Sequence, residues 1–357
     1  MEFKQRKRAL IDLGHFLERY LSNQPGNANE SQKFQALNEL IKRAGQKNPW
    51  FTQDFVGNAL HAWQKALQQE KIDKWLSDYN FPDEPTHKIG IVAAGNIPLV
   101  GLHDLICAFI SGQNLLIKQS KKDQILLPVF AQLLLKNDEH QHIEFTEDQL
   151  KNFDAVIATG SNNTSRYFEY YFRQYPSVIR HNRNSVAVLS GDESDDELNL
   201  LADDIMMYFG LGCRNVAKIY IQSDFDFDRL FKALLKYQNL INHHQYASNY
   251  EYNKAVYLMS DVKLLDNGMI LFKEDDSFSS PIACLNYEYY TSKEELTYKL
   301  NSQKNNIQCV VGHKDYINLA DVKFGETQIP ALWNYADNIN TLNFLQTTIK
   351  QENHEEA

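Results

Sequence analysis

Apolar positions recur every three or four residues through the first 80 residues of the chain, a spacing that predicts amphipathic helices. The clearest run is Leu10, Leu13, Phe16, Leu17, Tyr20 and Leu21. The segment FPDEPT at 81–86 then brings two prolines and two acids, which stop a helix and mark a junction. We therefore expect a helical N-terminal region at 1–85.

From residue 87 the pattern changes to short apolar runs that alternate with helix-length segments. Strands are expected at 88–94, 114–118, 154–159 and 185–189, with helices at 99–111, 123–135 and 162–175. Alternation of this kind predicts a parallel sheet with crossover helices, an architecture typical of nucleotide-binding domains. We place this domain at 86–190, completed by 326–350.

A second series of elements follows an acidic turn, GDESDDE, at 191–197. A helix is expected to about residue 208, and further helices at 226–240 and 293–303. Strands are expected at 216–221, 269–272, 281–285 and 307–311. The pattern thus predicts a second α/β domain at 191–325, and an α/β fold class for the chain.

The length and net charge of the chain limit the classes of protein to which it can belong. The chain has 357 residues, enough for two domains that each bury a core. Its 43% hydrophobic content is that of an ordinary globular protein. A formal net charge of -10 argues against a nucleic-acid binder, which would show a basic face.

The four cysteines are widely spaced and form no CxxC pair, so we expect neither a disulfide framework nor a metal site. The first 21 residues carry charges on every turn and lack the apolar core of a signal peptide. Polar residues interrupt the longest apolar region, 89–112, so no membrane span is expected. These features predict a cytoplasmic protein.

Cys213 is the candidate nucleophile. It lies in YFGLGCRNVAKIYIQ at 208–222, between glycine-bearing turns and an expected strand, where a thiol is accessible to substrate. The alternative is a small residue in a tight connection, since free cysteines are usually buried. Cys107, Cys284 and Cys309 fall inside expected apolar elements and are predicted to be core residues.

The loop after the first expected strand reads AAGNIPLVGLHD and lacks a GxGxxG fingerprint. It places Asn96 close to Pro98 at the carboxyl end of a strand, where a side-chain amide can donate to a developing oxyanion. The alternative reading is a turn-forming asparagine.

Two further loops could hold a nucleotide. LIKQSKKD places Lys118, Ser120 and Lys121 after the second strand, where they can pair with phosphate on a nucleotide ribose or form a solvated face. In ATGSNNT, Gly160 permits close backbone approach and Ser161 can cap the next helix. The free N–H groups there suit a pyrophosphate, although a plain helix cap has the same sequence.

These segments together resemble a known family. The ordered set is GNIP, LIKxS, ATGS, the cysteine loop, a Phe-Ser-Ser-Pro turn within 276–281, and FGETQIP at 324–330. It resembles the aldehyde dehydrogenase superfamily, and within it the LuxC-type long-chain fatty acyl-CoA reductases, from about residue 85 to 345. The resemblance implies an aldehyde-dehydrogenase-like fold, with a Rossmann-type nucleotide-binding domain and a catalytic domain at 191–325.

The resemblance also implies roles. Cys213 matches the thiolate nucleophile, Asn96 the oxyanion amide, and Lys118 the lysine on the adenosine ribose. Gly160 and Ser161 match the turn under the pyrophosphate. Asp276, two residues before Phe278, matches the carboxylate on the nicotinamide ribose, although two serines here replace the single glycine before the proline.

Two departures from the family pattern indicate the reaction. Hydrolytic members carry a glutamate in an ELGGKS segment, whereas the matching segment here, RHNRNS at 180–185, has no carboxylate. An enzyme without that base would form free acid poorly and would suit conversion of a thioester to an aldehyde. Lys121 stands where NAD-preferring members have a glutamate, which favours NADPH and leaves NADH possible.

We therefore expect NADPH-dependent reduction of a fatty acyl-CoA, or another acyl thioester, through an acyl-cysteine at Cys213. The resemblance further implies a homo-oligomer and a complex with an acyl-transferring or acyl-activating enzyme. One alternative is a cofactor-independent acyltransferase or thioesterase that uses His243 or His181. Another is a non-catalytic acyl-CoA-binding scaffold. His243 and His244 are expected at the end of a helix, in solvent.

Overall fold

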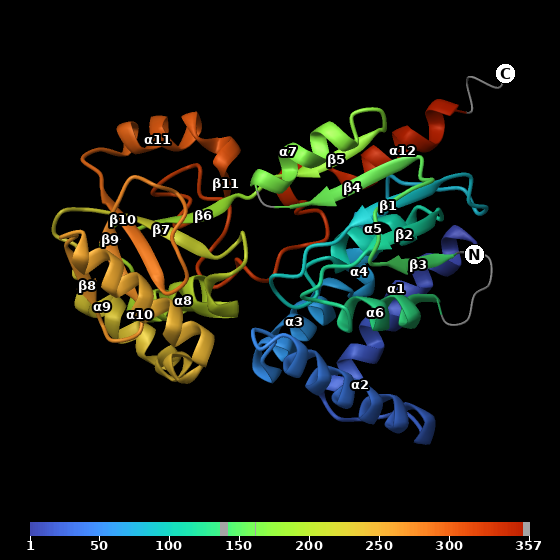
Figure 1. The fold of residues 1–357 in the computed structure, drawn as a ribbon, viewed down its shortest axis with the longest axis horizontal. Coiled ribbons are helices and arrows are strands. Elements are labelled where there is room, and N and C mark those ends of the chain that lie inside the picture. The colour runs from blue at the N-terminus through green and yellow to red at the C-terminus, as the bar shows by residue number, and fades with distance from the viewer. Residues whose placement is uncertain (136–141, 161, 353–357) are drawn as a thin grey trace. The chain divides into compact units, whose positions relative to one another are not determined.

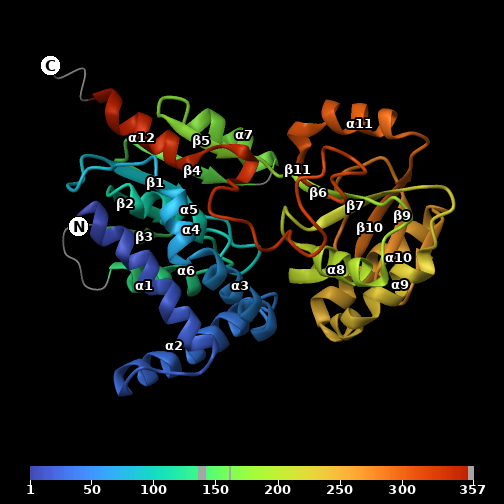
Figure 2. The ribbon, with the colours of Figure 1, turned by 180° about the vertical axis from the view of Figure 1, so that it is seen from behind.

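The computed structural model describes residues 1–135, 142–160 and 162–352. The chain forms two compact units, which we call unit 1 (Met1–His181 and Ile329–Ala357) and unit 2 (Asn182–Gln328). Figures 1 and 2 show their elements from opposite sides. The boundary follows His181, whereas the boundary expected from the sequence followed residue 190.

Unit 1 contains a five-stranded parallel sheet. Its order is β3 (Ile143–Thr146), β2 (Asn114–Lys118), β1 (Lys88–Val92), β4 (Ala155–Thr159) and β5 (Ser177–Arg180). The inner strands are apolar because helices cover a parallel sheet on both faces. These helices are α5 (Leu102–Ile110), α6 (Leu126–Leu135), α7 (Asn162–Tyr171) and α12 (Thr341–Glu352). The predicted parallel α/β arrangement is confirmed.

The predicted helical N-terminal region is also confirmed. It consists of α1 (Phe3–Leu21), α2 (Ala28–Lys47), α3 (Gln53–Ala66) and α4 (Gln69–Trp75). Its α1 packs against α3, α5 and α6. Arg6 of α1 is fully buried and donates from Nε to the Ile110 carbonyl at 3.0 Å and from Nη2 to the Pro82 carbonyl at 2.8 Å. These bonds fasten the helical region to the sheet domain.

Unit 2 contains a six-stranded sheet. Its order is β11 (Ile307–Val311), β6 (Asn184–Val188), β7 (Val216–Ile221), β10 (Cys284–Tyr289), β9 (Leu271–Glu274) and β8 (Leu264–Asp266). All neighbours are parallel except β8 and β9. The helices are α8 (Asp195–Met206), α9 (Phe227–Leu234), α10 (His244–Met259) and α11 (Lys293–Ser302). Short 3₁₀ segments lie at Met207–Gly210, Leu235–Asn242 and Lys304–Asn306, and in unit 1 at Ala336–Asn338.

Several elements differ from the sequence prediction. The edge strands β3, β5 and β8 were not expected, because they have only three or four residues, too few to form a recognisable apolar run. The helix expected at 226–240 ends at Leu234 and continues as a 3₁₀ segment. Helix α10 was missed, and β9 and β10 lie two or three residues beyond their expected starts.

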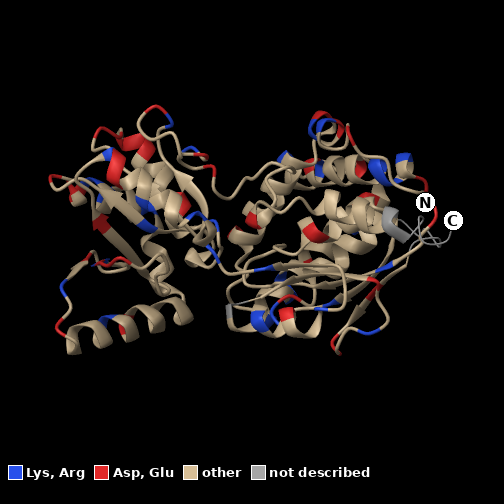
Figure 3. Ribbon diagram, turned by 90° about the horizontal axis from the view of Figure 1, so that it is seen from above, with Lys and Arg blue, Asp and Glu red and all other residues tan. Residues whose placement is uncertain are grey.

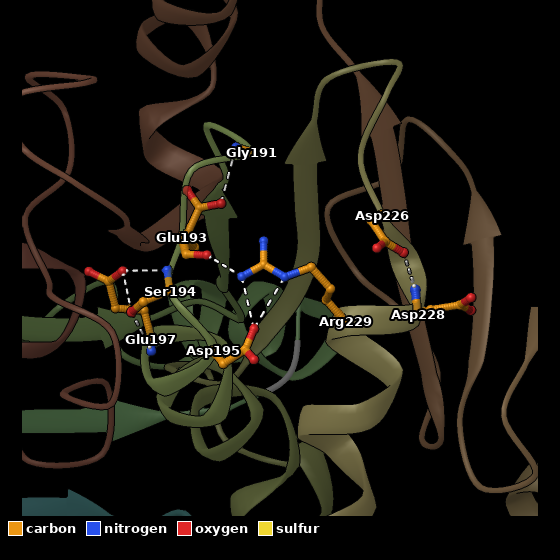
Figure 4. A network of polar contacts seen from close by, with 8 residues as sticks. All are labelled: Gly191, Glu193, Ser194, Asp195, Glu197, Asp226, Asp228 and Arg229. Carbon is orange, nitrogen blue, oxygen red and sulfur yellow. Dashed lines mark hydrogen bonds and ion pairs between the residues drawn. The ribbon is translucent and has the colours of Figure 1, made fainter.

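The acidic turn at 191–197 joins β6 to α8 and folds back on its own backbone (Figure 4). The Glu193 side chain is 2% exposed and accepts hydrogen bonds from the Ser190 N–H at 2.6 Å and the Gly191 N–H at 3.1 Å. Arg229 of α9 donates to the Glu193 carbonyl at 2.6 Å and to Asp195 at 2.9 Å. The turn therefore fixes where α8 begins.

Acidic and basic residues are interspersed over both units in the described part of the chain (Figure 3). None of the helices among these residues combines the length and the apolar character that a membrane span requires. Nor do three or more His, Cys, Asp or Glu side chains gather within the described ranges in a way that could hold a metal ion.

Candidate active site

The cysteine loop of unit 2 begins with a left-handed turn. Tyr208, Phe209 and Gly210 have φ values of 53°, 58° and 72°. For the two aromatic residues this conformation costs roughly 1–2 kcal/mol each, so packing must hold it. Both are buried. The centroid of the Phe209 ring lies 4.6 Å from that of His243, which directly precedes α10, and 5.6 Å from that of Tyr246, in the first turn of the helix.

Asn215 fixes the loop two residues beyond Cys213. Its side chain is 2% exposed, donates to the Asp204 carbonyl at 3.1 Å and the Met207 carbonyl at 2.8 Å, and accepts from the Gly212 N–H at 2.8 Å. Its own N–H donates to the Gly212 carbonyl at 3.0 Å and closes the turn that contains Cys213. The backbone of the candidate nucleophile is thus tied to the end of α8.

Cys213 is half-buried, whereas the other three cysteines are buried. Ser185 of β6 donates to the Cys213 carbonyl at 3.0 Å and lies 3.0 Å from the Cys309 sulfur. Burial raises the pKa of Cys309 to about 11 and that of Cys284 to about 12, and it raises the pKa of Cys107 well above its usual value. Those three thiols remain protonated at neutral pH, as their expected place in the core requires.

The FGETQIP segment is held to the same loop within unit 2. Arg214 donates from Nε to the Thr327 carbonyl at 2.6 Å. Asp204 of α8 accepts from the Thr327 hydroxyl at 2.7 Å and the Gly325 N–H at 2.7 Å. Burial raises the Asp204 pKa to about 6, although these hydrogen bonds oppose the shift. The guanidinium of Arg214, the residue after Cys213, therefore has a structural contact with Thr327.

In unit 1 the strand order places the other candidates at one edge of the sheet. Strands β2, β1 and β4 are neighbours, and the loops at their carboxyl ends carry Lys118, Asn96 and Gly160. The chain order reverses between β1 and β4, and open α/β sheets bind ligands at such a switch point. Asn96 is half-buried, in a turn that includes buried Leu99 at a φ of 58°.

The first two of these loops touch. A Cβ atom at Gly95 would lie 2.6 Å from Ser120, so only glycine permits this approach. Lys118 donates from Nζ to the Asp148 carbonyl at 3.1 Å and the Glu147 carbonyl at 3.3 Å, which supports the turn after β3. Lys121 is exposed in the same loop.

Gly160 lets α7 begin close to its strand. A Cβ atom there would lie 2.9 Å from the Phe168 ring and 3.0 Å from Thr164. Ser161, the predicted partner of Gly160, lies outside the described residues. In unit 2, Asp276 is exposed and Phe278 is half-buried in the connection between β9 and β10.

Arg180 is the first residue of the RHNRNS segment at 180–185. Under the resemblance, this segment matches the one in which hydrolytic members of the aldehyde dehydrogenase superfamily carry a glutamate. It is 3% exposed and donates from Nη2 to Asp104 at 2.5 Å and to Thr341 at 2.9 Å, and from Nη1 to the Ala336 carbonyl at 2.7 Å. Burial lowers the Arg180 pKa, but the charge and hydrogen bond of Asp104, together with the charges of other neighbours such as Asp337, raise it, and the net shift is upward. This side chain is a fixed cation.

The histidines considered as alternative bases have structural contacts. His243 follows a 3₁₀ segment and is the N-cap of α10, where its ring accepts from the Tyr246 N–H at 3.4 Å. His243 is half-buried, and His244, the first residue of α10, is exposed as expected; their place at the start of a helix was not expected, because α10 was not foreseen. His181 donates its backbone N–H to the Asp337 carboxylate at 3.0 Å, and its ring Nε2 lies 3.4 Å from the Glu169 carboxylate.

The sequence matches the acyl-CoA reductase (LuxC) family over residues 53–279. The chain belongs to this family. The resemblance to LuxC-type reductases is thereby confirmed, and the protein is an oxidoreductase of the acyl-CoA reductase class.

Solved structures similar to this LuxC-family chain are aldehyde dehydrogenases. Aldehyde dehydrogenase 21 from Physcomitrella patens has a TM-score of 0.66 at 12% identity, over 98% of this chain and 84% of that one. Indole-3-acetaldehyde dehydrogenase from P. syringae has a TM-score of 0.62 at 14% identity, over 93% and 75%. An aldehyde dehydrogenase from Bacillus cereus has a TM-score of 0.61 at 14% identity, over 90% and 76%. The predicted aldehyde-dehydrogenase-like fold is confirmed; no curated protein matches the sequence.

The structure of this LuxC-family chain groups its candidates by unit. Asn96, Lys118, Ser120, Lys121 and Gly160 lie in unit 1 at the carboxyl edge of the sheet, and Cys213, Asp276 and Phe278 lie in unit 2. Sequence reasoning missed Asn215 and Asp204, which shape the cysteine loop. The available signal for Asp204 was a pair of acids, Asp203 and Asp204, within the otherwise apolar stretch LLADDIMM at 200–207.

Proposed function

We propose that this protein reduces a fatty acyl-CoA to the aldehyde, with NADPH as reductant and Cys213 as nucleophile. The observation that carries the proposal is the buried Arg180–Asp104 pair. A cation fixed by three acceptors cannot take a proton from water, so this position cannot serve as the base of a hydrolytic enzyme. The acyl-enzyme would then persist until it is reduced.

In the first step the Cys213 thiolate attacks the carbonyl carbon of acyl-CoA. A bond forms between that carbon and Sγ, the carbon–sulfur bond to CoA breaks, and CoA leaves as a thiolate that is then protonated. The Asn96 amide and the Cys213 N–H donate to the carbonyl oxygen as it gains charge; loss of one such donor costs on the order of 3 kcal/mol of barrier. The turn fixed by Asn215 keeps the Cys213 N–H in place.

Bound NADPH would supply a hydride to the acyl carbon. The bond from that carbon to Sγ then breaks, Cys213 leaves as a thiolate, and the aldehyde carbonyl forms again. One acyl-CoA, one NADPH and one proton thus give one aldehyde, one CoA and one NADP⁺.

The residues present fit this cofactor. Gly95 packs closely against Ser120, and Gly160 packs closely against Thr164 and Phe168, so that the Ser120 loop and helix α7 both lie near the carboxyl edge of the sheet. Lys118, Ser120 and Lys121 would hold the adenosine ribose and its phosphate, and Gly160 with Ser161 the pyrophosphate. Asp276 and Phe278 would hold the nicotinamide ribose.

Mass spectrometry of the protein incubated with acyl-CoA alone tests the covalent step. We expect an acyl adduct on Cys213 in the wild type and none in Cys213→Ala, because the other three thiols are buried and protonated. An adduct that persists in Cys213→Ala would sink the proposal.

Absorbance of the reduced nicotinamide separates this proposal from its rivals. Only a reductase consumes NADPH in step with acyl-CoA; a thioesterase or acyltransferase would release CoA without consuming it, and a scaffold would do neither. The proposal also includes three features that the resemblance implies. They are an acyl-thioester donor, self-association of the chain, and a complex with an acyl-transferring or acyl-activating enzyme.

A further inference from the structure

We propose that Asn286 is a positioning residue that clamps the turn bearing Asp276 and Phe278, and thereby sets how tightly the nicotinamide cofactor binds. The inference rests on the proposed function, since it takes the turn to contact the cofactor. It starts from the connection between β9 and β10, which are parallel and in register with Cys284 beside Leu271. Residues 275–283 must therefore run back along the sheet, and they do so without a helix.

A connection of this kind lacks the internal hydrogen bonds of a crossover helix, so side chains have to hold it. Asn286 is 2% exposed on β10 and donates from Nδ2 to the Ser277 carbonyl at 3.0 Å and the Ser279 carbonyl at 3.1 Å. The two carbonyls flank Phe278. One amide group thus fixes the backbone on both sides of this ring.

The side of the turn that faces the sheet has a rigid support. Lys218 of β7 is the partner of Asn286 in the strand register and is fully buried. Its Nζ lies 2.5 Å from Glu288 and 5.4 Å from the centroid of the Phe278 ring. Phe278 also packs against the apolar core of unit 2. The Phe278 ring therefore keeps its position as long as the backbone of the turn does not move.

The turn has room to move if the clamp is lost. A cavity of about 460 Å³ is lined by Ser277, Ser279, Ser280 and Asn286, among others. In the described part of the chain, the buried Oδ1 of Asn286 has no hydrogen-bond partner, so this side chain is held in place only through the two bonds that it donates to the turn. Asp275 accepts from the Ser277 N–H at 2.7 Å and donates its own N–H to the Tyr287 carbonyl at 3.1 Å, which holds the start of the turn. Within the turn, the Ser277 hydroxyl donates to the Ser279 carbonyl at 3.3 Å.

The test compares Asn286→Ala and Asn286→Asp with Asn253→Ala. Asn253 is the matched control because it is also a buried asparagine of unit 2 and donates to the Ile282 carbonyl at 2.9 Å, beyond the clamped turn. The aspartate variant keeps the shape of the side chain but places oxygen against two carbonyl oxygens.

Two readouts are needed, namely equilibrium binding of NADPH and acylation by acyl-CoA in the absence of cofactor. We expect both Asn286 variants to bind NADPH about tenfold more weakly, with acylation within about twofold of wild type, because only the turn is released. Asn253→Ala should leave both unchanged. Steady-state kinetics should show a raised KM for NADPH with a smaller change in kcat.

Unchanged NADPH binding in both Asn286 variants would overturn the inference, and so would an equal loss of binding and acylation, which indicates general damage to unit 2. Failure of the wild type to be acylated would instead count against the proposed function. The binding titration would still decide the role of Asn286 in that case.

Discussion

Arg180 is the residue on which the proposed choice of reduction over hydrolysis depends. The resemblance places it in the segment that supplies the water-activating glutamate of hydrolytic aldehyde dehydrogenases. Here the position holds a buried cation with an ionic partner, Asp104, on α5. The sequence alone shows that this segment lacks a carboxylate. It does not show the ion pair between Arg180 and Asp104, because the two residues lie far apart along the chain.

Replacing Arg180 with Met should lower the free energy of unfolding by about 3–5 kcal/mol, because Asp104 would stay buried without its cation. Urea unfolding measures this loss. The control is Lys88→Met, which removes an exposed ion pair to Glu144 at 3.1 Å and should cost less than about 1 kcal/mol. Equal losses in the two variants would contradict the structural role assigned to Arg180.

At the scale of elements, long apolar segments were predictable and short or polar ones were not. The inner strands β1, β2, β4, β6 and β7 match their expected positions because they are apolar and largely buried, and so does β11, an edge strand whose residues are all buried. Helix α10 was missed because its buried positions are filled by Tyr246, Tyr250 and Asn253, which give no apolar stripe. Likewise the site residues could be named from ordered motifs, whereas Asn215 and Asn286 act on partners that only the folded chain brings near.

Asn215→Ala should slow acylation of Cys213 by about tenfold or more, since it removes the bonds that tie the Cys213 turn to α8 and leaves buried carbonyls unpaired. Quench-flow mass spectrometry with acyl-CoA measures the rate. Asn249→Ala serves as control, because it removes a similar side-chain bond at 2.8 Å within α10. If both variants acylate at the wild-type rate, the turn does not depend on Asn215.

At the scale of the whole molecule, the proposed cofactor contacts are divided between the two units. The loops proposed to bind the phosphates belong to unit 1, and the turn at 276–280 belongs to unit 2. Family membership fixes the class of reaction. Under the proposed function, selectivity between NADPH and NADH depends on the charge of Lys121 in unit 1.

Lys121→Glu should lower kcat/KM for NADPH by about tenfold or more and improve the relative use of NADH, because a carboxylate repels the extra phosphate and can accept from ribose hydroxyls. The matched control is Lys122→Glu, which makes the same charge change at the adjacent exposed residue. An identical NADPH to NADH ratio in the wild type and Lys121→Glu would rule out this contact.

The left-handed run at Tyr208, Phe209 and Gly210 has a consequence for protein engineering. The local sequence does not favour this conformation at two aromatic residues, so the loop takes its shape from α8, α10 and Asn215. The segment YFGLGCRN would therefore not keep this conformation if it were transferred alone to another protein. A designer who wished to install this thiol in another scaffold would need to transplant both helices with it.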